Sequence, residues 1–425
     1  MSSTGDTKLP TGGTGSLKNL TVENIHASHM GSRFVLLTGS STLCDPSGVA
    51  MSNIVIRNNS SRDGMPYVLA VGSNGPVYGN EQGIINGLVI DNNAGKVGGI
   101  NPFIALQTIT INDNFTVSNI TNPVAFAQPM IQFYGGVNFS KILVKDSNVV
   151  LDNSVYTNGI IFANSTTNNA IGDVTFDNVN VSTQGTLTYG AFMLQIGGGA
   201  SNSWKSFNII GGSTVGNVQY FDNQNTIGEI NITGGHRWGS SISNYTAVNV
   251  VYRLNNVVIT PTASGTGTFN IQNAGTYNLN FKDVRYESTN GPLVYAIGVS
   301  GATINVNIDG INGNPTPYSL LSNNGASGVN TWNVYAHNVT NNSATGFSNS
   351  SSYAATVNWN NPDGTLLVPF GGSNITTTKT NKGTFATPSN GSAPSGYTGT
   401  YVPGIPHVSD GTNFRSLANP TVNYY

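Results

Sequence analysis

One short phrase recurs along the chain: alternating apolar residues, one polar residue, and then Asn, Asp or Gly. The copy INGLVIDNN, residues 85–93, shows it most clearly. Alternation with a period of two is typical of a β-strand with one buried face, because successive side chains point to opposite sides. Each copy therefore predicts a short strand, and their repetition predicts a repeated fold. The copies are NLTVEN (19–24), NIVIRN (53–58), GLVIDN (87–92), TITIND (108–113), KILVKD (141–146), DVTFDN (173–178), SFNIIG (206–211), EINITG (229–234), TFNIQN (268–273), NLNFKD (278–283), NVNIDG (305–310) and TVNWNN (356–361), with TWNVYA (331–336) as a degenerate copy.

The last position of the phrase is Asn, Asp or Gly in every copy except TWNVYA, which ends in Ala336. These three residue types tolerate the left-handed backbone conformation, Gly because it lacks a Cβ, Asn and Asp through local hydrogen bonds. We therefore expect each strand to end in a turn that requires a positive φ.

The spacing of the copies predicts the architecture. Successive last positions lie 34, 34, 21, 33, 32, 33, 23, 39, 10, 27, 26 and 25 residues apart. Most of these intervals suit one coil of a solenoid with several strands per coil. The interval of 10 is too short for a coil, so either TFNIQN or NLNFKD lies outside the column. A β-propeller would have more regular blades and its own signatures, and an array of sandwiches is a further alternative. We predict a right-handed parallel β-helix.

A second class of segments lies between the copies, apolar and followed by Gly, Asn or Ser. We expect them to form a second strand of each coil that faces the same core. Only 8% of the residues are charged, against roughly 25% in an ordinary soluble domain, and residues with high β-propensity are abundant, so the chain is predicted to be all-β. The segments are RFVLLTGS (33–40), YVLAVGSNG (67–75), MIQFYGG (130–136), GIIFANS (159–165), FMLQIGGG (192–199), VQYFDNQ (218–224) and LVYAIGVSG (293–301).

The two ends of the chain differ from the middle. We expect residues 1–16 to form an N-terminal arm, residues 17–361 the parallel β-helix, and residues 362–425 an irregular, Gly- and Pro-rich C-terminal segment in extended and hairpin conformation. The stretch HVSDGTNF (407–414) predicts a hairpin, because Asp-Gly suits a tight type I′ turn. The aromatic residues of the C-terminal segment need a surface to pack on, in the helix or in a neighbouring subunit.

Charge and composition disfavour several classes of function. The net charge is −2 and basic residues do not cluster, which argues against nucleic acid as the partner. No apolar stretch is long enough for a transmembrane helix, so membrane insertion is not expected, and the N-terminus lacks the apolar core of a signal peptide. Cys44 is the single cysteine, which excludes a multi-Cys metal site. We expect no cofactor and no metal.

Over residues 17–361 the strand pattern resembles the pectate-lyase-like β-helix proteins, and among them bacteriophage tailspikes and fibres. The Asn-, Thr-, Ser- and Gly-dominated composition is similar to that of phage virion proteins. The resemblance implies a homotrimer on the surface of a phage particle, with other virion proteins as partners and host attachment as the role. Such proteins commonly bind bacterial surface polysaccharide, and many cleave it. Tailspikes usually carry a sizeable N-terminal particle-binding domain, whereas here the strand pattern begins by residue 17, which favours a head fibre or a decoration protein.

Cleavage of a glycosidic bond requires two carboxylates near each other, one of them a proton donor. The candidate carboxylates are Asp146, Asp177, Asp222 and Glu229. Turn carboxylates usually accept hydrogen bonds from backbone N–H groups for structural reasons, and none of these four lies in a recognisable catalytic motif. The chain therefore leaves enzymatic activity uncertain and leans towards a non-enzyme.

The stretch GGHRWGSS (234–241) places His236, Arg237 and Trp238 directly after two glycines. Trp and Arg stack on sugars and bind carboxylates, and His transfers protons near neutral pH. We predict that these residues form a loop that leaves the coil and contributes a contact surface. The alternative is a loop anchored by burial of Trp238.

Three functions remain open. The leading prediction is a virion structural fibre or spike, on the tail or the head, that presents a β-helix for attachment to the host. The second is a tailspike depolymerase that hydrolyses or lyses bacterial surface polysaccharide. The third is a bacterial extracellular β-helix adhesin.

Overall fold

The structure is a computed structural model, and the residues it describes form strands and turns, with no helix among them. Their Cα positions divide into two compact units, Met1–Gly228 and Glu229–Tyr425. The described part contains no helix that could cross a membrane. The described residues are 17–27, 35–38, 49–61, 68–71, 83–95, 102–121, 125–126, 128–134, 137–152, 158–163, 170–185, 191–196, 203–216, 218–222, 227–240, 249–260, 267–287, 291–313, 318–325, 327–340, 346–360, 370–379, 382–385, 407–410 and 414–416.

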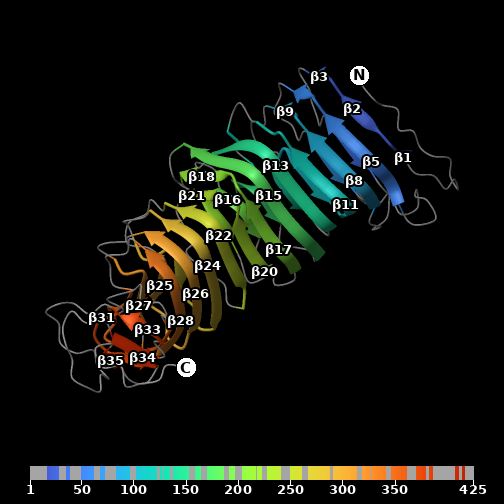
Figure 1. The fold of residues 1–425 in the computed structure, drawn as a ribbon. Coiled ribbons are helices and arrows are strands. Elements are labelled where there is room, and N and C mark those ends of the chain that lie inside the picture. Colours follow the sequence, from blue (N-terminus) through green and yellow to red (C-terminus); the bar gives the residue numbers. More distant parts are fainter. Residues whose placement is uncertain are drawn as a thin grey trace. The chain divides into compact units, whose positions relative to one another are not determined.

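The first unit contains one large parallel sheet, whose strands lie side by side in Figure 1. A second parallel sheet and a small third sheet come from the segments between these strands. The large sheet consists of β1 (Leu17–Lys18), β2 (Thr21–Glu23), β5 (Val49–Arg57), β8 (Gly83–Asp91), β11 (Ile109–Ser118), β13 (Asn138–Asp152), β15 (Ala170–Gln184), β17 (Ser203–Ile210) and β18 (Ser213–Gly216). The second consists of β4 (Val35–Thr38), β7 (Val68–Val71), β10 (Ile104–Gln107), β12 (Ile131–Tyr134), β14 (Asn158–Ala163), β16 (Ala191–Ile196) and β19 (Val218–Asp222), and the third of β3 (His26–Ala27), β6 (Ser60–Ser61) and β9 (Ala94–Gly95).

The second unit repeats this arrangement with a large and a smaller parallel sheet and ends in an antiparallel sheet. The parallel pairing includes β31 and β32, so it extends past residue 361. The large sheet contains β20 (Ile227–Thr233), β21 (His236–Ser240), β22 (Val251–Ile259), β24 (Thr276–Tyr286), β26 (Thr303–Gly313), β28 (Asn330–Thr340), β30 (Ala355–Asn360) and β32 (Ile375–Lys379). The smaller contains β23 (Phe269–Ile271), β25 (Val294–Ile297), β27 (Leu321–Asn324), β29 (Phe347–Asn349) and β31 (Phe370–Gly372), and the antiparallel one β33 (Lys382–Phe385), β34 (His407–Asp410) and β35 (Phe414–Ser416).

Within the parallel sheets of each unit, the chain returns to the same sheet after crossing over, and strands pair in parallel with strands one repeat later in sequence. This is the topology of a parallel β-solenoid, because a strand can pair in parallel with its successor only after the chain has crossed over. The prediction of an all-β fold built from stacked parallel strands is confirmed. All seven segments predicted to form a second strand contain one, namely β4, β7, β12, β14, β16, β19 and β25.

A column of residues with positive φ follows the large sheet in both units, as the sequence predicts. In the first unit these residues are Asn24, Asn58, Asn92, Asn119, Asp146, Asn178 and Gly211, with φ between 46° and 61°. In the second they are Gly234, Asn256, Asp283, Gly310 and Asn338, with φ between 50° and 94°. In each of these coils the column thus places a residue that tolerates the αL conformation at the same point.

Two copies of the phrase, those ending at Asp113 and Ala336, sit differently from the prediction. TFNIQN forms β23 of the smaller sheet, which explains the interval of 10 residues. Asp113 lies within a register shift of β11, between Asn112 and Phe115, and the column residue of that coil is Asn119. The degenerate copy does not break the column, because its residue is Asn338 rather than Ala336. Asn361, assigned to the column from the sequence, lies outside the described residues.

The core of the first unit is aliphatic and aromatic and lies between the sheets. Ile54, Leu88, Ile142 and Val174 are fully buried, and Phe176 packs on Phe207 with ring centroids 5.2 Å apart. Like residues stack from coil to coil because neighbouring strands are in register. Identical neighbours can then share one rotamer along the stack, which keeps the core dense.

Buried asparagines complete the turns of the first unit. Asn59 accepts a hydrogen bond from the backbone N–H of Ile25 at 2.9 Å and donates to the carbonyl of Val22 at 3.0 Å. Asn93 accepts from the Asn59 N–H at 3.1 Å and donates to the Ile56 carbonyl at 2.9 Å. Each Asn therefore satisfies backbone groups of the preceding coil that would otherwise be buried without a partner.

The predicted hairpin near the C-terminus is present as β34 and β35, which pair antiparallel with Ser409 opposite Phe414. The turn between them and most of residues 362–425 lie outside the described residues, as does the predicted arm, residues 1–16.

Candidate functional site

Four strands of the second unit, β24, β26, β28 and β30, contain Thr, any residue, and Asn at or next to their first residue. Thr276, Thr303, Thr331 and Thr356 lie opposite one another in register, and so do the asparagines two positions later. Alternate residues of a strand share a face, and the residues between them are buried, so Thr and Asn lie on the outer face. A third row lies two positions further on. We call these three rows the T-x-N face: Thr276, Thr303, Thr331, Thr356, Asn278, Asn305, Asn333, Asn358, Asn280, Asn307, Tyr335 and Asn360.

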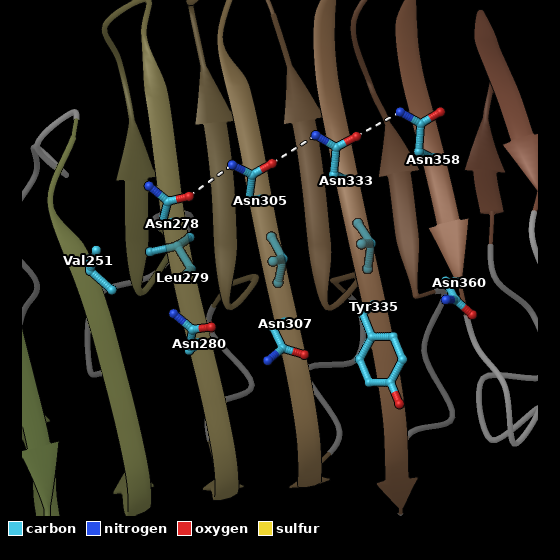
Figure 2. Close-up of a pocket in the computed structure, with 12 residues that line it drawn as sticks. Val251, Asn278, Leu279, Asn280, Asn305, Asn307, Asn333, Tyr335, Asn358 and Asn360 are labelled. Carbon is cyan, nitrogen blue, oxygen red and sulfur yellow. Dashed lines mark hydrogen bonds between the residues drawn. The ribbon is translucent and has the colours of Figure 1, made fainter.

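The middle row is a hydrogen-bonded ladder, drawn in Figure 2. The side-chain amide of Asn305 donates to Oδ1 of Asn278 at 2.9 Å. Asn333 donates to Asn305 at 2.8 Å, and Asn358 donates to Asn333 at 2.7 Å. Every amide in the ladder points the same way, so the row has a fixed direction and its side chains have fixed positions.

The third row forms the other edge of a shallow groove of about 600 Å³. The Asn280 amide donates to the backbone carbonyl of Tyr252 at 3.2 Å. The Asn307 side chain is exposed and forms no hydrogen bond with the described part of the chain. Tyr335 is 40% exposed, and Figure 2 shows its ring on the same line as Asn280 and Asn307. The groove thus has amides on both edges and one aromatic ring.

Large buried residues support the face from below. Tyr277, Ile304 and Trp332 are fully buried directly between the Thr and Asn rows, and Trp332 packs edge-on against Phe347 with centroids 5.1 Å apart. Burial raises the pKa of the Tyr277 hydroxyl above its ordinary value, a shift opposed by its hydrogen bond to the Asn273 carbonyl. The hydroxyl therefore stays neutral at physiological pH, and the face rests on a rigid apolar layer.

Charged side chains border the T-x-N face but do not belong to it. Glu229 and Arg253 form an ion pair of 2.9 Å on the strands before β24. Asp309 and His337 lie two residues past the third row, with Oδ1 and Nδ1 3.0 Å apart. Lys282 lies in register with Asp309 and is exposed. The groove between them is lined by neutral side chains. It can offer amide donors and acceptors, hydroxyls and one ring, but no full charge.

The stretch GGHRWGSS is not a loop that leaves the coil. Gly234 and Gly235 form a turn with positive φ, and the next residues form β21, which pairs in parallel with β22. His236 is fully buried and Trp238 is 3% exposed, packed against Phe269. Of the three candidate contact residues, only Arg237 is exposed, at 56% of its side chain.

Arg237 belongs to a small charged cluster rather than to the T-x-N face. Its guanidinium lies 3.2 Å from the Glu287 carboxylate, and Arg285 contacts the other oxygen of that carboxylate at 2.8 Å. The carboxylate thus bridges two arginines on the surface of the second unit. Because Arg237 and Arg285 are mostly exposed, solvent screens these pairs strongly.

Two of the candidate carboxylates, Asp146 and Glu229, have structural partners. Asp146 has positive φ and accepts a hydrogen bond from the Asn178 amide at 3.0 Å, as expected of a turn residue. Asp177 lies in β15, in register with Lys145. Glu229 forms the ion pair with Arg253. Asp222 ends β19, and its side chain lies outside the described residues.

The sequence does contain a repeat that predicts the T-x-N face, at positions of the strands that the apolar phrase does not describe. The stretches TYNLN, TINVN, TWNVY and TVNWN repeat Thr, Asn and Asn (or Tyr) at every second position. The apolar residues and the last position of the phrase describe the core and the turn. The outer positions of the same strands carry the face.

Within the described residues, no group of three or more His, Cys, Asp or Glu side chains is placed to hold a metal ion. Comparisons with protein-family models, with curated proteins and with solved structures find no match. The fold and the face define a parallel β-solenoid with an uncharged, hydrogen-bonding groove on its outer surface.

Proposed function

We propose that this chain is a structural fibre or spike protein of a virus particle, whose β-helix, right-handed in its coiling, presents a surface for attachment to the host. The parallel solenoid with stacked coils supports this proposal. So does the resemblance of the strand pattern and of the composition to phage tailspikes and fibres. The attachment surface in this proposal is the T-x-N face.

The observation that carries the proposal is the regularity of that face. Four coils present the same Thr-x-Asn group in register, and a ladder of amides fixes three successive contacts at 2.7–2.9 Å. A folded protein needs no such outer order for its core, which lies on the other side of the strands. A cell surface is itself repetitive, and repeated weak contacts on a rigid support add up to firm attachment.

Attachment can be tested with fluorescently labelled protein on a panel of bacterial cells. Replacing Asn305 and Asn333 with Lys places two unpaired like charges in the ladder, and we expect cell binding to fall at least about tenfold. The matched control is Asn148→Lys with Asn180→Lys, which alters an equivalent ladder in the first unit, where the two amides lie 3.0 Å apart. Unchanged cell binding in the face variant would contradict the proposal.

The location can be tested by electron microscopy with antibodies against the chain. Labelled virus particles are the expected result. Label on bacterial envelopes in the absence of particles would favour an adhesin instead.

One observation favours the depolymerase alternative. Asp309 holds Nδ1 of His337 at 3.0 Å, just beyond Tyr335 at the edge of the groove. A carboxylate that orients an imidazole is a common arrangement for a general base. A reducing-end assay on polysaccharide from cells that bind the protein tests this, with His337→Ala as the variant. Release of new ends by the native chain, lost in that variant, would establish cleavage.

A further inference from the structure

We infer that the groove of the T-x-N face binds a neutral, linear polysaccharide that runs across β24, β26, β28 and β30, with one sugar ring for each coil. This inference rests on the proposed function and names the chemistry of the surface partner.

The direction of the bound chain follows from the direction of the ladder. The Asn row runs from strand to strand, perpendicular to the backbone, as Figure 2 shows. Neighbouring strands lie about 4.8 Å apart. A sugar ring in an extended chain with equatorial linkages advances by nearly the same length. A chain that lies along the row therefore meets the same side chains at each ring, whereas a chain laid along one strand meets a different residue at every step.

The two edges of the groove suit the two edges of a sugar ring. The middle and third rows are two residues apart on each strand, or about 6.6 Å. Equatorial hydroxyls leave a pyranose ring close to its plane, towards both edges. Asn305 and Asn333 each use one N–H and one oxygen lone pair in the ladder, which leaves one N–H and one lone pair for a ligand. On the opposite edge, the unengaged amide of Asn307 offers the same groups.

Tyr335 supplies the anchor for this chain. It is the one aromatic residue in the three rows and is 40% exposed, while its neighbours in the row are asparagines. An aromatic ring packs against the C–H face of a sugar, and its hydroxyl remains free to hydrogen-bond. A single exposed ring among small polar groups is typical of a contact that dominates binding energy.

The charges around the groove indicate a neutral ligand. The charged side chains nearest the groove lie outside its lining: Arg253 pairs with Glu229, Asp309 contacts His337, and Lys282 is exposed in register with Asp309. Recognition of an acidic sugar would call for an arginine or lysine directed into the groove, and the groove lining contains neither. Binding through neutral groups is insensitive to salt, whereas binding between unpaired charges is screened.

The first test is a length series measured by isothermal titration calorimetry. The probes are β-1,4-linked glucose and β-1,4-linked N-acetylglucosamine oligosaccharides, from the disaccharide to the octasaccharide, with oligogalacturonate as the acidic comparison. For at least one neutral series we expect affinity to rise with each sugar up to about four, one for each of the four strands at their spacing, and then to level off. We expect the same affinity at low and at high salt.

The second test uses variants in the groove. Tyr335→Ala should weaken binding about tenfold, because an aromatic contact of this kind contributes on the order of one tenfold step. Tyr335→Phe should retain most of the affinity. Asn307→Ala should weaken binding several-fold. Asn180→Ala, in the ladder of the first unit, should change nothing. Thermal melts of each variant separate a lost contact from a lost fold.

The outcomes distinguish this inference from the proposed function. No binding of either neutral series, or salt-sensitive binding of oligogalacturonate alone, would overturn the inference. If the native chain still attached to cells, and the Asn305 and Asn333 variant did not, the proposed function would stand without it. Oligosaccharide binding by a chain that attaches to no cell would reject the proposed function alone.

Discussion

Asparagine serves three separate purposes in this chain, depending on where its side chain lies. Asn93 is buried and completes backbone hydrogen bonds of the preceding coil. Asn256 adopts positive φ in the column. Asn307 faces outward in the groove. The sequence predicted the second purpose, because positive φ restricts residue type strongly. It could not separate the other two, because a polar residue inside a turn and one on a surface look alike without the fold.

The buried purpose predicts a large effect on stability. Replacing Asn93 with Ala leaves the Asn59 N–H and the Ile56 carbonyl without their partner. We expect the free energy of unfolding to fall by about 2–4 kcal/mol, measured by urea denaturation. Asn180→Ala removes two partly exposed side-chain contacts, to Asn148 at 3.0 Å and from the Ser213 hydroxyl at 2.8 Å, whose groups water can satisfy, and should cost less than about 1 kcal/mol. Equal effects of the two substitutions would contradict the distinction.

The segment around Arg237 shows where reasoning from residue type misled. Scarcity of charge made Arg237 and Trp238 look like a binding pair. The period-two alternation already placed His236 and Trp238 on one face and Arg237 on the other. Strand β21 follows that alternation, with the first and third side chains buried.

Trp238 and Arg237 should therefore respond differently to truncation. Trp238→Ala opens a cavity beside Phe269 and should lower the free energy of unfolding by about 3–5 kcal/mol. Arg237→Ala removes a screened surface ion pair and should cost less than about 1 kcal/mol. Thermal and urea unfolding of both variants measure the difference. A stable Trp238→Ala chain would mean that the indole is not part of the core.

At the level of strands, the pattern predicted both sheets but assigned some column residues wrongly. The coil that contains β11 has a register shift between Asn112 and Phe115, which is why the sequence pattern wrongly predicts Asp113 as its column residue. Asn119, six residues later, has that place and has φ of 53°. Asn256 was missed because LNNVVI carries its Asn in the middle of the apolar residues rather than after them. Bulges and shifts of this kind depend on pairing between distant strands, which a local pattern does not record.

Asn256 allows the column to be tested directly. Its φ is 54°, and no hydrogen bond to its side chain occurs in the described part of the chain. Asn256→Val should destabilise the protein by about 1–2 kcal/mol, because a β-branched residue is strained there. Asn256→Gly should change stability by less than about 1 kcal/mol. If Val and Gly gave the same unfolding midpoint in urea, backbone conformation would not be what selects this residue.

For the whole molecule, the C-terminal segment is the part whose composition bears on assembly into an oligomer. The parallel pattern ends with β32, and the antiparallel strands β33, β34 and β35 follow it. A three-stranded sheet alone buries little apolar surface, yet residues 382–425 contain Phe385, Tyr397, Tyr401, Phe414, Tyr424 and Tyr425. Apolar side chains in such number need a surface to cover them. We propose that the surface belongs to other copies of the chain and that the assembly is a homotrimer.

Light scattering on the purified chain tests this proposal, and a mass of three chains is the expected result. Deleting residues 382–425 removes β33, β34 and β35 but leaves every parallel pair intact. We therefore expect the shortened chain to lose the trimer while its circular dichroism keeps the strand signal of the solenoid. A full-length chain that is monomeric and folded at micromolar concentration would contradict the proposal. A shortened chain that remains trimeric would place the subunit contacts on the outer faces of the sheets rather than in the C-terminal segment.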